Sequence, residues 1–221
     1  MTDASGSSQN GSLKLILGLL AALVLAALVY VFYYKDAAKD QTKAGGEQTQ
    51  LADNVMGKED APVTIIEFSS MTCPHCAIFH KDTLPGLKSK YIDTGKVKYI
   101  LREFPLDPLA GAAFMLGRCL PKKDSYFDFI DVLYARQNEW ANAKDPINAL
   151  KTLAKQAGFT DESFKACLDD KELYGKVLAV KNKGSEEFRI RSTPTFFING
   201  TRLEGAQPLA EFEKLIEPVL K

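Results

Sequence analysis

The residues with the clearest chemistry are Cys73, Pro74, His75 and Cys76, which form a Cys-x-x-Cys motif. Cysteines at this spacing can cycle between a dithiol and a disulfide. If a helix begins at the motif, backbone N–H groups and the positive end of the helix dipole favour the thiolate of the first cysteine. Protonated His75 would add positive charge near that sulfur. We expect Cys73 to be the nucleophile and Cys76, one helical turn along and more buried, to be the resolving partner.

A second feature is Thr193-Pro194, at the start of the segment TPTFFI. Proline is poorly tolerated inside a strand because it cannot donate a hydrogen bond to the sheet. A cis bond before Pro194 resolves this conflict, since cis prolines usually serve tight, positioned turns. We expect this turn to face the two cysteines.

A zinc site is the alternative interpretation of the motif, with Cys73, Cys76 and His80 as three ligands. The sequence places neither a second cysteine pair nor a fourth ligand close by. The strand before the motif and the Thr-Pro strand after it favour redox chemistry. We find no nucleotide, metal or flavin motif, so the only redox carrier that we expect is the cysteine pair itself.

The segments around these residues predict an α/β fold. APVTIIEFSS and VKYILREF indicate two buried strands, and residues 74–90 between them indicate a helix. This order is typical of a βαβ unit with parallel strands. TPTFFI and TRLEGA, joined by a turn at Asn199 and Gly200, predict a hairpin, and residues 209–220 predict a final amphipathic helix.

The chain between the βαβ unit and the hairpin is predicted to be helical. Expected helices begin at Pro108 and Pro146 and cover residues 126–135, 164–168 and 173–180. The expected architecture is a small mixed sheet with a helical subdomain inserted at about residues 107–190.

Two further cysteines, Cys119 and Cys167, lie in this helical region. They could be free buried thiols that act as small hydrophobes. We favour a structural disulfide, because leftover cysteines in one small subdomain tend to pair in an oxidising compartment. Such a bridge closes a loop of about 49 residues and contributes roughly 4 kcal/mol if its effect is chain entropy.

The amino-terminal part of the chain predicts a membrane anchor. After a polar tail at 1–14, residues 15–34 carry no charge and as a helix would span roughly 30 Å, the thickness of the bilayer hydrocarbon. A cleaved signal peptide is the alternative, but its apolar region is usually shorter and ends in small residues. We predict an uncleaved transmembrane helix, a polar linker at 35–58 and a folded domain at 59–221.

Composition excludes other classes of protein. The 221 residues are 46% hydrophobic, which is enough for a substantial core and excludes disorder. The 28 basic and 28 acidic side chains balance, and no basic cluster is present. Nucleic acid is therefore not an expected partner, because phosphates must be met by clustered Lys and Arg.

The segment DAPVTIIEFSSMTCPHC, followed after a helical stretch by STPTFFINGTRLEGA, resembles the DsbA-like branch of the thioredoxin-fold thiol:disulfide oxidoreductases. The resemblance covers about residues 59–221, and Pro-His between the cysteines is typical of its oxidising members. It implies a thioredoxin fold, a cis Pro194 that borders the disulfide and helps to hold substrate peptides, and a buried Glu67 that assists proton transfer. The chain departs from the family in having His80 in place of a glutamate, and Thr193 where many strong oxidants have valine.

The resemblance implies an enzyme that introduces disulfide bonds into reduced exported proteins and is re-oxidised by a quinone-linked, DsbB-like membrane protein. A disulfide isomerase or reductase of the same fold is one alternative. A non-catalytic, membrane-tethered peptide-binding protein is another.

Oxidising chemistry requires an oxidising compartment, so we expect the folded domain on the periplasmic or extracytoplasmic side of a bacterial inner membrane. The positive-inside rule favours the opposite orientation, because Lys35, Lys39 and Lys43 follow the apolar segment and only Lys14 precedes it. Long domains are translocated largely regardless of charge, so we give the redox argument more weight.

Overall fold

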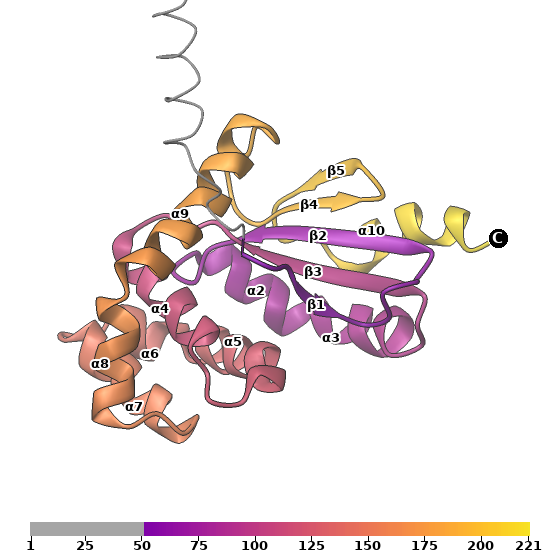
Figure 1. Cartoon of the computed structure of the whole chain (residues 1–221). Helices are drawn as coiled ribbons and strands as arrows, with labels where there is room; N and C mark the ends of the chain where they lie inside the picture. Colours follow the sequence, from indigo (N-terminus) through magenta and orange to yellow (C-terminus); the bar gives the residue numbers. More distant parts are fainter. Residues whose placement is uncertain (1–50) are drawn as a thin grey trace, which may run out of the picture. The chain divides into compact units, whose positions relative to one another are not determined.

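The computed structural model describes residues 51–221, which are built around a five-stranded sheet in the order β1-β3-β2-β4-β5 (Figure 1). The strands are β1 (Asn54–Met56), β2 (Val63–Ser69), β3 (Val97–Glu103), β4 (Thr195–Ile198) and β5 (Thr201–Glu204). β2 and β3 are parallel, and the other neighbours are antiparallel. The predicted α/β fold with a mixed sheet is confirmed.

The helices and helical turns lie mostly between β3 and β4 in the chain (Figure 1). They are α2 (Pro74–Asp82), α3 (Leu84–Leu87), a π-helical turn (Lys88–Ile92), α4 (Pro108–Arg118), a 3-10 turn (Lys123–Ser125), α5 (Tyr126–Ala135), α6 (Gln137–Ala141), α7 (Pro146–Gln156), α8 (Asp161–Asp169), α9 (Lys171–Glu186), α10 (Leu209–Ile216) and a 3-10 turn (Glu217–Val219). Figure 1 shows α4 to α8 gathered at one end of the sheet.

β2 carries Glu67, a residue of the site, into the interior of the protein. Both faces of this strand are covered. Successive side chains of a strand point to opposite faces. Ile65 and Glu67, both fully buried, lie on the face covered by α2. Phe68 points to the other face, where it packs with Phe104 and Ile190. A carboxyl group is thus held in the interior between the apolar residues Ile66 and Phe68 of this strand.

The helix predicted over residues 74–90 is interrupted after Asp82. α2 ends there, and α3 begins at Leu84 with Pro85 in its first turn. Proline has no N–H, so the hydrogen-bond ladder of α2 cannot continue through Pro85, whereas the first turn of a new helix accepts it. The prediction of one continuous helix was wrong for this reason.

The predicted linker at 35–58 was too long at its carboxyl end. β1 lies within it and pairs with β3, Asn54 opposite Leu101 and Met56 opposite Tyr99. The Asn54 side chain also donates to Glu103 Oε1 at 3.1 Å. A three-residue strand is too short to show an alternating pattern, which is why the sequence did not reveal it.

The predicted tail at 1–14, the predicted anchor at 15–34 and most of the predicted linker lie outside the described residues. Within residues 51–221, no helix is sufficiently long and apolar to cross a bilayer.

A disulfide joins two helices of the region between β3 and β4. Cys119, at the carboxyl end of α4, is bonded to Cys167 of α8, with their Cα atoms 6.0 Å apart. The bridge spans 48 positions of sequence. It therefore fixes α8 to α4 across the segment that contains α5, α6 and α7.

Candidate active site

Cys73 is the residue that precedes the first turn of α2, and Pro74 is the first residue of the helix. Proline suits this position because its fixed φ is helical and an N–H there would have no partner within the helix. The Cys76 N–H donates to the Cys73 carbonyl oxygen at 3.1 Å, and the backbone groups of His75 and Cys76 lower the pKa of the Cys73 thiol. The local sequence thus builds a site for a negatively charged sulfur at a helix start.

The strand β4 brings a second segment to the same sulfur. Cys73 Sγ lies 3.3 Å from the carbonyl oxygen of Thr193 and donates to it as a thiol. The Thr193-Pro194 peptide bond is cis. Residues 120 positions apart are therefore in direct contact at the cysteine pair.

Both cysteines of the motif are free thiols, so the structure describes the reduced form of the pair. A hydrogen bond from the Cys76 side chain is the main cause that lowers the pKa of Cys73 from 9.0 to about 5. Burial opposes this shift, and the side chain of Thr193 and the backbone groups of Cys76 and His75 lower the pKa further. At neutral pH Cys73 is consequently a thiolate.

Cys76 is fully buried and behaves in the opposite way. Burial is the main cause that raises the pKa of Cys76 well above 9.0, with the neighbouring Cys73 and the negative charge of Glu67 adding to it. Hydrogen bonding by the Ser69 side chain works against the rise. The two thiols are therefore divided into a thiolate, Cys73, and a proton-bearing partner, Cys76.

Glu67 lies at the centre of a buried polar cluster below the cysteines. Its Oε1 accepts from Ser69 Oγ at 2.6 Å, and its Oε2 accepts from Tyr99 Oη. Ser69 Oγ is also 2.7 Å from Tyr134 Oη. Oε2 further contacts His80 Nε2 at 3.3 Å. The carboxylate that the family resemblance places below the site is thus buried and hydrogen-bonded.

His80, on α2, connects this cluster to a carboxylate at the surface. Its side chain is only 2% exposed, and its Nδ1 lies 3.0 Å from Asp131 Oδ1 on α5, whose side chain is 49% exposed. Burial alone would lower the pKa of His80, but the charge of Glu67 and the hydrogen bond to Asp131 outweigh it and raise the pKa to about 9. His80 is therefore a cation at neutral pH.

The zinc alternative conflicts with this arrangement. A zinc ligand needs a ring nitrogen with a free lone pair. Both nitrogens of His80 are directed at carboxylates, Nε2 at Glu67 and Nδ1 at Asp131. His80 therefore belongs to a charge network and not to a ligand set with Cys73 and Cys76.

Two further residues, His75 of the motif and Gln137, lie near Cys73, and the sequence analysis missed Gln137. The imidazole of His75 is exposed, and His75 influences Cys73 through its backbone N–H. Gln137, on α6, donates from Nε2 to the carbonyl oxygens of Met71 at 2.8 Å and Cys73 at 3.0 Å, which holds the loop before α2. Gln137 lies on a helix of five residues, and no pattern in the sequence marks it.

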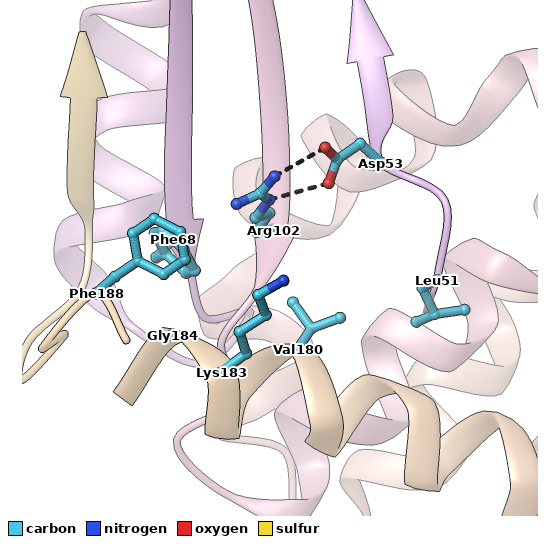
Figure 2. A pocket seen from close by; sticks show the side chains of 8 residues that line it. All are labelled: Leu51, Asp53, Phe68, Arg102, Val180, Lys183, Gly184 and Phe188. Atoms are coloured by element: carbon cyan, nitrogen blue, oxygen red, sulfur yellow. Dashed lines mark hydrogen bonds and ion pairs between the residues drawn. The ribbon is translucent and has the colours of Figure 1, made fainter. Parts of the chain in front are cut away.

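A small pocket lies on the face of the sheet to which Phe68 points (Figure 2). It encloses about 20 Å³, room for little more than one water molecule. Figure 2 shows Arg102 of β3 paired with Asp53 by two contacts of 3.0 and 2.9 Å. Phe68, Lys183 and Phe188 line the pocket as well. It contains none of the residues around the cysteine pair, so we assign it no part in the site.

The lowered pKa of Cys73 predicts how the difference in stability between the reduced and the oxidised protein depends on pH. The thiol titrates near 9.0 when unfolded and at about 5 when folded, so between these values the unfolded reduced chain binds more protons. We expect the reduced protein to gain stability relative to the oxidised protein as pH rises from 5 to 9, and to lose this gain as pH falls through 5. Urea unfolding of both forms at several pH values measures the difference.

His80 does not obscure this comparison, although its raised pKa acts in the opposite direction. Its contribution to the free energy of unfolding is complete below about pH 6.5 and is lost as pH rises through about 9. We expect this contribution to be the same in both forms, because its partners Glu67 and Asp131 do not take part in the exchange of disulfides. Ultraviolet absorbance of the thiolate gives the midpoint of Cys73 directly. An ordinary midpoint, ~8.5, would contradict the assignment.

Comparison with known proteins finds a thioredoxin family model and relatives named for disulfide chemistry. Residues 49–218 match the family model described as thioredoxin. A Rickettsia bellii protein provisionally named a protein-disulfide oxidoreductase is 34% identical over 152 residues, which are 69% of this chain and 59% of that protein. The chain thus spans less than two thirds of the length of that relative. The disulfide bond formation protein D of Bacillus subtilis is 28% identical over 80% of this chain and 81% of its own length.

The crystal structure of alpha-DsbA1 from Wolbachia pipientis is similar with a TM-score of 0.70. The two sequences are 32% identical, and the match covers 77% of this chain and 94% of that one. Together with a family model that covers most of the chain and a cysteine pair held between a helix start and a cis proline, this similarity shows that the chain belongs to the DsbA-like branch of the thioredoxin-fold thiol:disulfide oxidoreductases.

Proposed function

We propose that this protein oxidises pairs of thiols in reduced exported proteins to disulfides. The observation that carries the proposal is the placement of the cysteine pair: Cys73 lies at a helix start against the cis Thr193-Pro194 bond, which fits its lowered pKa, and Cys76 is fully buried. Stabilising the thiolate stabilises the reduced protein, so its disulfide is the stronger oxidant. Electrons therefore flow from substrate thiols into this protein.

The reaction proceeds in two exchanges. A substrate thiolate attacks Cys73 Sγ of the Cys73–Cys76 disulfide, and Cys76 leaves as a thiolate that takes up a proton. The second substrate thiolate then attacks the substrate sulfur of the mixed disulfide, and Cys73 leaves as a thiolate. The substrate loses two electrons and the cysteine pair gains them. Cys73 is a good leaving group, because a low thiol pKa speeds departure.

The residues around the pair have supporting parts in this proposal. Thr193 and Pro194 lie against the reactive sulfur and contact the substrate peptide beside it. Pro74 and His75 shape the helix start, and Glu67 assists proton transfer to the buried thiol. The cysteine pair is the only redox group that the reaction requires.

The proposal includes a location and a partner. Residues 15–34 anchor the protein in the bacterial inner membrane, with the folded domain on the periplasmic or extracytoplasmic side. A quinone-linked, DsbB-like membrane protein re-oxidises the pair. The Cys119–Cys167 disulfide supports this location, because structural disulfides persist in oxidising compartments and are rare in the cytosol.

The reduction potential of the Cys73–Cys76 couple against glutathione tests the function. An oxidase is expected to have a potential near the ~−120 mV of DsbA, and in any case above the ~−180 mV of disulfide isomerase. A value near thioredoxin's ~−270 mV, together with rapid reduction of insulin, would instead identify a reductase. Efficient refolding of scrambled ribonuclease would favour the isomerase alternative.

A further inference from the structure

The loop at residues 70–73 joins β2 to α2 and ends at the reactive cysteine. A side chain from a distant helix, Gln137 of α6, reaches this loop. Its Nε2 donates to two carbonyl oxygens of the loop, that of Met71 at 2.8 Å and that of Cys73 at 3.0 Å. The side chains of all three residues are buried. The contact is therefore shielded from water, which could otherwise replace a lost donor.

The two carbonyl groups depend on Gln137 to different degrees. The Cys73 carbonyl, which starts the hydrogen-bond ladder of α2, also accepts from the N–H groups of Cys76 at 3.1 Å and Ala77 at 3.2 Å. Within residues 51–221, by contrast, Gln137 is the only hydrogen-bond donor to the Met71 carbonyl. A buried carbonyl group without a donor is costly. Loss of the Gln137 amide would therefore displace the loop until Met71 finds another donor, and Cys73, two residues further on, would move with it.

The direction of the Cys73 side chain is set by its backbone. Cys73 is extended, with φ −80° and ψ 119°, immediately before the helical residues of α2. In this conformation its Sγ lies 3.3 Å from the carbonyl oxygen of Thr193. The two carbonyl groups that Gln137 holds lie on either side of the Cys73 Cα along the chain. Gln137 thus restrains the backbone from which the reactive sulfur projects.

We propose that Gln137 is a positioning residue that holds Cys73 so that its sulfur stays between the start of α2 and the Thr193 carbonyl. Gln137 touches no reacting atom and acts through the backbone of Cys73. The inference rests on the proposed function, because it assigns Gln137 a part in presenting the nucleophile of that reaction. Misplacement of a reacting group by about 1 Å can cost about 10²-fold in rate, so a donor outside the motif can affect the chemistry.

The short helix α6 gives this side chain a firm support. Trp140, three residues after Gln137, lies on the same face of α6 and is buried. Its Nε1 donates to the carbonyl oxygen of Leu133 on α5 at 2.8 Å. A buried tryptophan therefore fixes the helix from which Gln137 reaches the loop.

A second contact fastens the loop without replacing Gln137. Thr72 Oγ1 donates to Asp107 Oδ2 at 2.5 Å, and Asp107 lies at the start of α4. This bond restrains the side chain of Thr72, whereas Gln137 restrains backbone carbonyl groups. The two contacts act on different groups, so the Thr72 bond does not compensate for the loss of Gln137.

The test compares Gln137→Met with Asn138→Met. Methionine is an unbranched side chain that can fill the same space, but it has no N–H to donate. Asn138 is the next residue of α6, is exposed and bonds Asn142 instead of the loop. The ultraviolet absorbance of the reduced full-length protein measures the pKa of Cys73. We expect Cys73 to be about tenfold weaker as an acid in Gln137→Met than in the wild type, whose pKa is about 5, and to keep the wild-type pKa in Asn138→Met.

The balance between the two redox forms separates positioning from support of the fold. A less stabilised thiolate makes the reduced protein less favourable, so the equilibrium constant with glutathione at pH 7 should move about tenfold toward the disulfide form of Gln137→Met. If Gln137 only supports the fold, both redox forms lose the same free energy of unfolding, and neither the pKa of Cys73 nor the equilibrium constant changes. That result in a folded Gln137→Met protein would overturn the proposal.

Gln137→Asn provides a second variant in case Gln137→Met does not fold. Asparagine keeps the amide group but is shorter by one methylene group, so its N–H groups cannot reach both carbonyl oxygens. We expect a smaller rise in the pKa of Cys73, and an unchanged pKa in this folded variant would also count against the proposal. Circular dichroism and urea unfolding establish that each variant is folded. A potential like that of thioredoxin in the wild-type protein would refute the oxidase function but not the role of Gln137, since the pKa is measured without a substrate.

Discussion

The Cys76→Ser variant is expected to stop after the first exchange and to accumulate as a mixed disulfide with its substrate. Cys73 still attacks a disulfide as a thiolate, but no second sulfur is present to resolve the product. Oxidase activity should fall to the uncatalysed rate. Intact mass spectrometry after incubation with an oxidised model peptide detects the adduct, and Cys73→Ser should form none.

Cys76→Ala is the matched control for the charge on Cys73. The hydrogen bond from Cys76 is the main cause of the low pKa of Cys73, and a serine hydroxyl can replace it whereas alanine cannot. At pH 6 we therefore expect the serine variant to form the adduct faster than the alanine variant. Equal rates would show that the helix start and Thr193 stabilise the thiolate without help from Cys76.

The same variants address the non-catalytic alternative. A peptide-binding protein does not need a nucleophilic sulfur. The Cys73→Ser variant of such a protein would therefore keep its full function in cells. An oxidase loses its function in cells in both the Cys73→Ser and the Cys76→Ser variant. Failure of Cys73→Ser to impair disulfide formation in exported proteins would therefore contradict the proposed function.

Local features of the site could be predicted from the sequence, because they depend on spacing within a few residues. Cys73, Pro74 and Cys76 indicate a helix start with one sulfur at its end, and the structure has this arrangement. Glu67 and Ser69 are two positions apart in one strand, so alternation places them on the same face. The contact between Cys73 and Thr193 was expected only in outline, from the family resemblance and the Thr-Pro dipeptide.

Contacts between distant segments could not be predicted in the same way. Asp131 and Tyr134 come from α5 and reach a cluster whose other members lie on β2, β3 and α2. The sequence marks His80 as a departure from the family, but no pattern in it shows that Asp131 faces the other side of the ring. Gln137 was missed because the hydrogen bonds that make it important go to backbone carbonyls, which have no sequence signature.

His80 also explains how the buried carboxylate is tolerated. An unpaired charge in the interior is costly, and a partner with further hydrogen bonds reduces the cost. Glu67 has His80 as its cationic partner and the hydroxyl groups of Ser69 and Tyr99 as donors. The Glu67 carboxylate and the His80 cation therefore compensate each other. Replacing either residue alone would leave the charge of the other buried without its partner.

Removal of the Cys119–Cys167 disulfide is expected to lower the free energy of unfolding by about 4 kcal/mol. The bridge spans 48 positions, and the chain-entropy relation gives roughly this value for a loop of that length. Cys119→Ser/Cys167→Ser should therefore unfold at a lower urea concentration than the wild type, with Cys73 and Cys76 kept reduced in both. The loop closed by the bridge contains α5 and α6, so the segment that carries Asp131 and Gln137 is part of what the bridge stabilises.

The site should survive this change even though the protein is less stable. None of the hydrogen bonds described around Cys73, Cys76 and Glu67 involves Cys119 or Cys167. The thiolate absorbance of Cys73 in the folded double variant should thus keep its midpoint at about 5. A loss of less than about 1 kcal/mol would mean that packing alone holds α8 against α4 and that strain offsets the entropic gain. A shifted midpoint would mean instead that the bridge helps to position the cysteine pair through α5 and α6.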